Sequence, residues 1–325
     1  MKRLFAAALA LWCAGPARAA AVSLPQSPAF VTISPAELRE RYDTVWAVSD
    51  IHGHLEELDA LLVRAALVTR GSDGRLSWTE GKARQLLVVA GDLIDGGPDS
   101  VGVVLLFRSL QPQAAAAGSR LIVLLGNHEV DFMYNPRSAS KELVSSAARA
   151  GIELRRKHRG DQLKEGELGQ YLRELPLAAT VGSWLFVHSG YMDVEDSDAA
   201  LTDYLARIAA SWTRGDADRY GPLSDPRSIV CYHNWWKSSH KRSLLQDHLE
   251  RLGLEGLVFG HDPDALGAMG SIAIKRSGRL IKIDTGLKTH QSRGMLLRCE
   301  VARGIGSDGC RAMTPDGALH ELPVR

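Results

Sequence analysis

The feature that constrains the fold most is a series of short, unbroken apolar runs, each of which stops at a small polar motif. The runs cover residues 44–49, 86–90, 121–125, 184–188 and 257–260. Helical spacing of apolar residues separates them, over residues 55–68, 101–117 and 244–252. Continuous apolar runs of this length are typical of strands buried on both faces, so the alternation predicts a layered α/β fold.

Three further segments complete the expected architecture. Residues 271–274 and 279–283 flank Ser277-Gly278, which is a turn signal for a hairpin. Residues 295–301 form a last apolar run. Residues 135–180 contain no such run and are rich in Arg, Lys, Glu and Gly, so we interpret them as a mostly helical insertion over one end of the sheet.

The N-terminus has the pattern of an export signal. Lys2-Arg3 forms a basic head, an apolar stretch extends to Gly15, and Ala17-Arg18-Ala19 supplies small residues at the positions that signal peptidase reads. The alternative, a buried first helix, fits poorly because the stretch ends in Gly15-Pro16. We therefore expect cleavage after Ala19, or after Ala21, and a periplasmic or secreted protein.

These observations divide the chain into four parts. We expect a signal peptide over residues 1–19, a proline-containing leader over 20–43, one main domain over 44–301 that includes the insertion, and a C-terminal tail over 302–325. Beyond the signal, no apolar stretch reaches the roughly 18 residues that a membrane span requires.

Charge argues against a nucleic-acid partner. The formal net charge is +1, and loss of Lys2, Arg3 and Arg18 with the signal would leave −2. A mildly acidic chain without blocks of Lys or Arg has no electrostatic attraction to a polyanion. Nothing in the sequence specifies an oligomeric state.

Three cysteines follow the signal. Cys299 and Cys310 are close in sequence, and in an oxidising compartment they would close a short loop, leaving Cys231 unpaired. Three unpaired buried thiols are the alternative.

Polar residues suited to metal binding follow each of the five apolar runs. In chain order these are Asp50 and His52, Asp92, Asn127, His188, and His261. The carboxyl ends of parallel strands share one edge of a sheet, so the residues should converge on one crevice. Three oxygen and three imidazole donors exceed the needs of one metal but suit two divalent ions that share a carboxylate. The absence of thiolate favours Mn, Fe or Zn at a reactive centre over a structural zinc site.

The same motifs carry a family resemblance. They read DIHG at 50–53, GDLID at 91–95, GNHE at 126–129, HSG at 188–190 and GH at 260–261. In order and approximate spacing they resemble the calcineurin-like metallophosphoesterase superfamily, and within it the bacterial, Shewanella-type relatives of the phosphoprotein phosphatases. The resemblance spans about residues 44–300 and implies a central β-sandwich flanked by helices.

The resemblance also implies residue roles. Asp50 and His52 would bind the first metal ion, Asp92 would bridge the two ions, and Asn127, His188 and His261 would bind the second. The attacking group would be a metal-bridging hydroxide. His128 would be the general acid, held by Asp95, and an Asp partner does fix the tautomer of an imidazole and raise its pKa.

The chain departs from the family where the substrate phosphate would be held. The related phosphatases have Arg at the position of Gly96, the segment around Cys231 offers no second Arg, and Pro263 replaces the second His of the wider superfamily's GHxH. An Arg binds phosphate through two parallel hydrogen bonds, which Gly cannot replace. We expect Lys237 to supply the missing cation, with Arg227 as the alternative.

The sequence therefore predicts an exported metal-dependent phosphatase that hydrolyses monoesters of phosphoproteins or of small molecules. A hydrolase of dinucleotide polyphosphates shares the motifs and is the first alternative. A non-catalytic protein that binds phosphate-bearing ligands is the second, although His128 and Asp95 would have no purpose in it.

Overall fold

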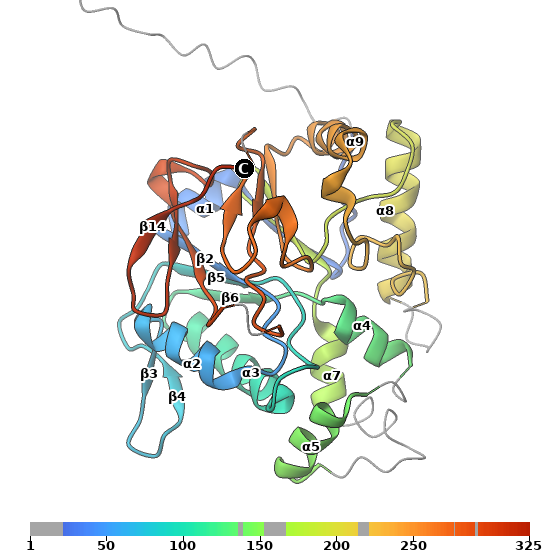
Figure 1. Cartoon of the computed structure of the whole chain (residues 1–325). Coiled ribbons are helices and arrows are strands. Elements are labelled where there is room, and N and C mark those ends of the chain that lie inside the picture. The colour runs from blue at the N-terminus through green and yellow to red at the C-terminus, as the bar shows by residue number, and fades with distance from the viewer. Residues whose placement is uncertain (1–21, 136–138, 153–166, 214–220, 276, 290–291) are drawn as a thin grey trace, which may run out of the picture.

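The computed structural model describes residues 22–325 except 136–138, 153–166, 214–220, 276 and 290–291. The predicted signal peptide, residues 1–19, lies outside the described residues, as does part of the predicted insertion. Two six-stranded sheets form the centre of the molecule, and helices lie around them (Figure 1). The predicted α/β class, a β-sandwich flanked by helices, is confirmed.

The two sheets have mixed topology. The first has the order β1 (Phe30–Ile33), β7 (Ala178–Val181), β8 (Trp184–Val187), β9 (Gly256–Phe259), β11 (Leu280–Lys282), β10 (Ala273–Ile274). The second has the order β14 (Leu319–Glu321), β13 (Cys310–Met313), β12 (Leu296–Glu300), β2 (Thr44–Val48), β5 (Gln85–Val89), β6 (Arg120–Val123). A separate hairpin joins β3 (Val68–Arg70) and β4 (Leu76–Trp78).

Burial on both faces explains why the central strands are apolar without alternation. Along β2, Val45 and Ala47 belong to the core between the two sheets, whereas Trp46 and Val48 belong to the core beneath the helices. β2, β5 and β6 run parallel to one another, and so do β8, β9 and β11. Each parallel set therefore ends at one edge of its sheet, which positions the loops that follow.

The helices and short 3₁₀ turns connect these strands. The α-helices are α1 (Pro35–Arg41), α2 (Leu55–Arg64), α3 (Ser100–Ala116), α4 (Asn127–Tyr134), α5 (Lys141–Arg149), α7 (Glu167–Glu174), α8 (Asp198–Thr213) and α9 (Ser239–Arg251). The 3₁₀ turns are η3 (Trp235–Lys237), η4 (Ala265–Gly267) and η5 (Val301–Arg303). Within the described part of the chain, no helix combines the length and apolar character needed to cross a bilayer.

Two expected boundaries need correction. The predicted leader contains β1, which pairs with β7, and the predicted tail contains β13 and β14, which extend the second sheet beyond β12. Both segments therefore belong to the folded domain. The described part of the predicted insertion over 135–180 contains the helices α5 and α7, and its last residues enter β7.

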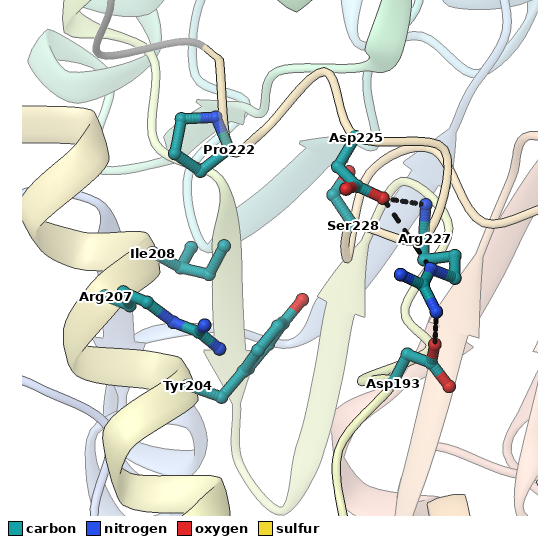
Figure 2. Close-up of a pocket in the computed structure, with 8 residues that line it drawn as sticks. All are labelled: Asp193, Tyr204, Arg207, Ile208, Pro222, Asp225, Arg227 and Ser228. Carbon is teal, nitrogen blue, oxygen red and sulfur yellow. Dashed lines mark hydrogen bonds and ion pairs between the residues drawn. The ribbon is translucent and has the colours of Figure 1, made fainter.

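Residues 222–228 lie beside α8. Tyr204 and Ile208 of α8 line a cavity of about 340 Å³ together with Pro222 and Arg227 (Figure 2). The cavity thus lies between α8 and the loop that leads toward η3.

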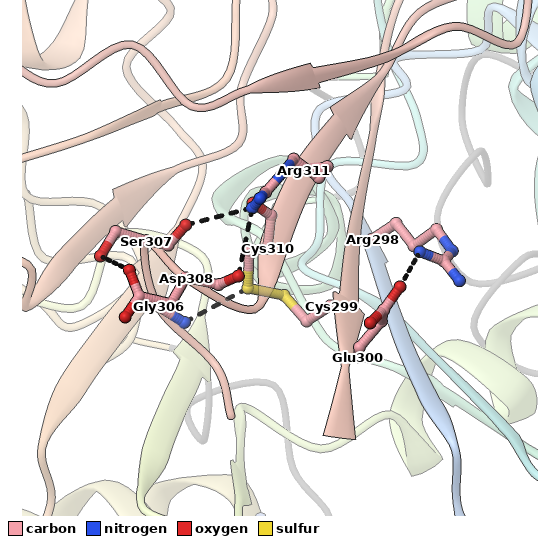
Figure 3. The surroundings of a disulfide bond; sticks show 8 residues. All are labelled: Arg298, Cys299, Glu300, Gly306, Ser307, Asp308, Cys310 and Arg311. Atoms are coloured by element: carbon pink, nitrogen blue, oxygen red, sulfur yellow. Dashed lines mark hydrogen bonds and ion pairs between the residues drawn. A yellow bond between two sulfur atoms is a disulfide. The ribbon is translucent and has the colours of Figure 1, made fainter. Parts of the chain in front are cut away.

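A disulfide bond joins β12 to β13. Cys299 and Cys310 are directly opposite each other in the antiparallel pair and are both fully buried (Figure 3). Of the two possibilities that the sequence left open, the structure has the bonded pair, and Cys231 is a free, buried thiol. The bond ties β13, and through it β14, to the central strands of the second sheet.

The disulfide should contribute measurably to stability. The two cysteines are 11 residues apart in sequence, and closing a loop of this size restricts the unfolded chain by about 2–3 kcal/mol. A Cys299→Ala, Cys310→Ala double variant should therefore lower the free energy of unfolding by that amount in urea denaturation. Reduced wild type is the matched control and should lose a similar amount. Equal stability of oxidised and reduced wild type would contradict a stabilising role.

Candidate metal centre

The loops at the carboxyl ends of the parallel strands meet at one cavity. Its volume is about 170 Å³. Five of the six predicted metal ligands line it, namely Asp50, His52, Asp92, Asn127 and His261. The sixth, His188, is fully buried behind them and contacts His261 and Asn127. The structure therefore brings together all six residues that the sequence selected.

The backbone is unusual at these strand ends. Nine non-glycine residues of the described chain have a positive φ, and five of them belong to the polar motifs. These five are Asp50 (54°), His52 (48°), Asp92 (54°), Asp95 (66°) and His261 (69°). A left-handed conformation costs energy for such residues and persists only where the surroundings enforce it, typically at functional sites.

A buried glutamate holds the loop after β5. The Glu129 carboxylate is fully buried and accepts hydrogen bonds from the backbone N–H groups of Asp92 (2.9 Å), Leu93 (2.7 Å), Ile94 (3.1 Å) and Gly126 (2.8 Å). A Cβ atom at Gly126 would overlap the Asp92 carboxylate, so only glycine permits this approach. Glu129 thereby fixes the position of Asp92 relative to α4.

Four electron-pair donors face one another around His188. Its Nδ1–H donates to the carbonyl of Ala90 (2.8 Å), which directs Nε2 toward Asn127 Oδ1 (3.0 Å), His261 Nδ1 (3.1 Å) and Asp92 Oδ2 (3.3 Å). His261 Nε2–H donates to the carbonyl of Cys231 (2.9 Å), so His261 Nδ1 also presents a lone pair. These atoms repel one another unless a cation, either a proton on His188 Nε2 or a metal ion, lies between them, and the donor set fits a transition-metal ion.

A second donor group lies on the other side of Asp92. His52 Nδ1–H donates to the carbonyls of Asp95 (2.8 Å) and Ile94 (3.1 Å). His52 Nε2 therefore faces the carboxylates of Asp92 (3.4 Å) and Asp50 (3.9 Å). The donor atoms of His52, Asp92 and His128 lie within 4.8 Å of one another, and so do those of Asp92, His188 and His261. Both groups include Asp92, as a bridging carboxylate between two ions would require.

The electrostatics favour cation binding. Burial lowers the pKa of His52 to about 4 and that of His261 to about 3, which keeps both rings neutral and their lone pairs free. Burial also acts on His188, but the charges of Asp92 and Asp50 outweigh it and raise the pKa of His188 to about 10. The carboxylates thus draw positive charge to the point between them.

A buried lysine supports the loops after β9 and β11. Lys282 is fully buried, and its ammonium donates to the carbonyls of Pro263 (2.9 Å), Ala268 (2.6 Å) and Asp284 (2.6 Å). Burial lowers its pKa to about 8, opposed by the nearby Asp284 and Asp50 carboxylates. Lys282 therefore fixes the segment beside His261 and adds positive charge beneath the buried acids.

The predicted acid pair is also assembled. His128 Nδ1 lies 3.1 Å from Asp95 Oδ2, and the ring is about a quarter exposed at the cavity. Burial works against protonation, but the Asp92 and Asp95 carboxylates raise the pKa of His128 above its ordinary value. Its Nε2 faces Lys288 Nζ at 2.9 Å. The ring is placed to give a proton to a group bound in the cavity.

The structure does not bring Lys237 or Arg227 into this cavity. Lys237 Nζ lies 3.6 Å from Asp264 Oδ2 and 4.9 Å from the centre of the Trp236 ring. Arg227 lines the separate cavity beside α8, where it pairs with Asp193 (3.7 Å) and with Asp225 (Figure 2). The prediction that either residue binds the phosphate has no support in this geometry.

Sequence reasoning assigned no role to other residues that line the metal cavity, including Lys288, Asp284 and His233. His233 stacks on His261 with ring centres 3.7 Å apart, and its Nδ1 lies 2.8 Å from Asp262 Oδ1. Asp284 and Lys288 follow β11, which is itself a parallel strand of the set. The rule that strand ends carry the site would have found them, had it been extended to this sixth strand.

A β-sandwich with Asp, His and Asn donors at the carboxyl ends of its strands defines a metal-dependent phosphoesterase. Comparison with known families agrees, because the model of the calcineurin-like phosphoesterases matches residues 44–265. The chain belongs to the calcineurin-like phosphoesterase family. The predicted class of enzyme, a metal-dependent phosphatase that acts on phosphate esters, is confirmed, and so is the resemblance to Shewanella-type relatives.

Three curated relatives show what the chain is similar to. An uncharacterized protein of Schizosaccharomyces pombe is 27% identical over 277 residues, which cover 77% of this chain and 75% of that protein. Shewanella-like protein phosphatase 2 of Arabidopsis thaliana is 27% identical over 126 residues, 37% of this chain and 31% of that protein. A symmetrical bis(5′-nucleosyl)-tetraphosphatase of Dechloromonas aromatica is 28% identical over 154 residues, 45% and 44% respectively. The chain thus matches less than half of the last two proteins.

Among solved structures, the cold-active protein-tyrosine phosphatase of a psychrophilic Shewanella species has the same fold. The TM-score is 0.68 with 20% sequence identity, and the match covers 93% of this chain and 83% of that one.

Proposed function

We propose that this protein is an exported phosphatase that hydrolyses phosphate monoesters, of phosphoproteins or of small molecules, with the aid of two divalent transition-metal ions. The observation that carries the proposal is the position of His128. Its Nε2 opens into the cavity that Asp92 and the other ligand candidates line, and Asp95 holds its Nδ1. A proton donor beside a metal centre is an arrangement for cleaving a bond, beyond what binding a ligand requires.

The donor groups divide naturally between two ions. Asp50, His52 and Asp92 would hold the first, and Asp92, Asn127, His188 and His261 would hold the second. Oxygen and imidazole donors without thiolate suit Mn, Fe or Zn. When bound, such ions would supply a water molecule with a lowered pKa and positive charge for the phosphoryl oxygens.

The remaining chemistry falls to the protein's own residues. Hydrolysis of a monoester breaks the bond between phosphorus and the ester oxygen, which leaves as an alcohol or phenol and needs a proton. The imidazolium of His128 would donate that proton from Nε2. Asp95 would keep the ring oriented and its positive charge stabilised, as the raised pKa of His128 indicates.

Two alternative functions share the metal donors, and one of them has support in a particular observation. Symmetrical bis(5′-nucleosyl)-tetraphosphatases are among the relatives, which favours hydrolysis of dinucleotide polyphosphates as the second candidate. A non-catalytic phosphate-binding protein would share the metal donors but would have no use for the His128–Asp95 pair. Substrate comparison separates all three.

The loss of activity on replacing His128 should depend on how much the leaving group needs a proton. The metal-loaded mature chain should hydrolyse p-nitrophenyl phosphate and phosphopeptides faster than a dinucleotide tetraphosphate. His128→Asn should lower kcat by about 10²- to 10⁴-fold on an alkyl phosphate, because an alkoxide leaves poorly without a proton. The loss should be smaller on p-nitrophenyl phosphate, because p-nitrophenolate needs little protonation. Exposed His320→Asn is the control.

Three results would overturn these assignments. Preference for the dinucleotide would favour the second candidate, and phosphate binding without turnover of any ester would favour the non-catalytic one. Equal losses on both leaving groups would contradict a general-acid role for His128.

Export rests on the basic and apolar N-terminal segment and on the buried disulfide, which is typical of proteins in oxidising compartments. The full-length chain, expressed in a Gram-negative host, should reach the periplasm and begin near Ala20 or Val22. N-terminal sequencing of the soluble product tests this expectation. A product that begins at Met1 would contradict export.

A further inference from the structure

The Lys288 side chain reaches the mouth of the metal cavity from the turn after β11. Lys288 lines the cavity, and its Nζ lies 2.9 Å from His128 Nε2. Among the described residues that line the cavity, it is the one Lys or Arg. No ion pair joins Lys288 to a carboxylate within the described part of the chain, in contrast to Lys237, which pairs with Asp264. Its ammonium contacts the His128 ring but no acid among the described residues, so its positive charge is not neutralised by a neighbouring carboxylate.

Gly96 provides the space that the Lys288 side chain uses. Gly96 has a φ of +117°, and a Cβ atom there would lie 3.0 Å from Lys288 Cγ and 3.3 Å from His52 Cβ. Even a methyl group at this position would be crowded by both neighbours. The glycine thus lets the stem of Lys288 pass over the loop that carries Asp95 and places the ammonium beside His128.

The charges around the cavity specify what the ammonium could bind. Asp50, Asp92 and Asp284 are buried at the base of the cavity, whereas Lys288 is exposed at its mouth. A phosphate group bound over the metal donors would direct its remaining oxygens toward the mouth. An anionic oxygen without a partner there would be costly, and an ammonium supplies both charge and hydrogen bonds.

We propose that Lys288 is the residue that binds the non-metal-facing oxygens of the substrate phosphate, and that it selects terminal phosphates, which carry two negative charges, over diesters, which carry one. This inference rests on the proposed phosphatase function. The 2.9 Å contact between Lys288 Nζ and His128 Nε2 places the ammonium directly beside the proton donor. This spacing lets each group contact a different oxygen of the same phosphate ester. An ammonium is a point charge on a flexible stem, so it responds to the charge of the ligand more than to its shape.

The test uses the metal-loaded mature chain and its Lys288→Ala and Lys288→Arg variants. Lys288→Ala should lower kcat/KM on p-nitrophenyl phosphate by about 10- to 100-fold, as expected for loss of one charged contact in the transition state. The loss on bis(p-nitrophenyl) phosphate should be several-fold smaller. Lys288→Arg should keep most of the activity. Lys82→Ala is the matched control, because Lys82 precedes β5 and so lies at the opposite end of that strand from Asp92.

A binding measurement separates this proposal from the proposed function. In calorimetry, inorganic phosphate should bind Lys288→Ala about 10-fold or more weakly than wild type, with metal content and melting temperature unchanged. If wild type hydrolyses no ester, the proposed function falls, and the phosphate affinities still decide the role of Lys288. Unchanged phosphate affinity in Lys288→Ala would overturn the proposal. Equal losses of kcat/KM on the monoester and the diester would contradict the proposed selectivity. Loss of bound metal from Lys288→Ala would show that Lys288 has a structural role instead.

Discussion

The Asp92 carboxylate faces three imidazoles from three different strand ends, and the rest of the site is arranged around this contact. One of its oxygens lies 3.3 Å from His188 Nε2, 3.4 Å from His52 Nε2 and 3.9 Å from His128 Nε2. His188 and His52 are both held by a hydrogen bond from Nδ1 to a backbone carbonyl, so their Nε2 atoms cannot turn away. A fixed convergence of donors on one buried carboxylate would be the physical basis for the proposed binding of two cations that share it.

Two more deeply buried residues, Glu129 and Lys282, hold the loops that carry these ligand candidates. Buried carboxylates are costly unless hydrogen bonds and opposite charges compensate for the lost hydration. Glu129 gathers four backbone N–H groups and thereby sets the turn after β5 against the start of α4. Lys282 joins three carbonyls from the loops after β9 and β11 beneath the acids. Both sheets are thus tied to one site, because Glu129 serves the second sheet and Lys282 the first.

The central strands and the convergence of the six candidate ligands could be predicted from the sequence because their signals are local. An unbroken apolar run followed by Asp, His or Asn needs no knowledge of distant contacts. β1 was missed as part of a sheet because its partner, β7, lies far away in the chain. β13 and β14 pair with near neighbours in the chain, and they were missed because neither sequence is an unbroken apolar run. Lys237 was chosen for its nearness in sequence to a family motif, yet it pairs with Asp264. The position of Lys288 beside the cavity follows from the parallel pairing of β11 with β9, and no short sequence motif indicates that pairing.

The central claim, that two cations share Asp92, is tested most directly by counting metal ions. Elemental analysis of metal-replete wild type should find about two transition-metal ions per chain. Asp92→Asn should lose most of both, because the bridging carboxylate belongs to both donor groups, whereas Asp50→Asn should lose mainly the ion nearest His52. A stoichiometry of one or less in wild type, or an Asp92→Asn protein that retains both ions, would contradict the shared site.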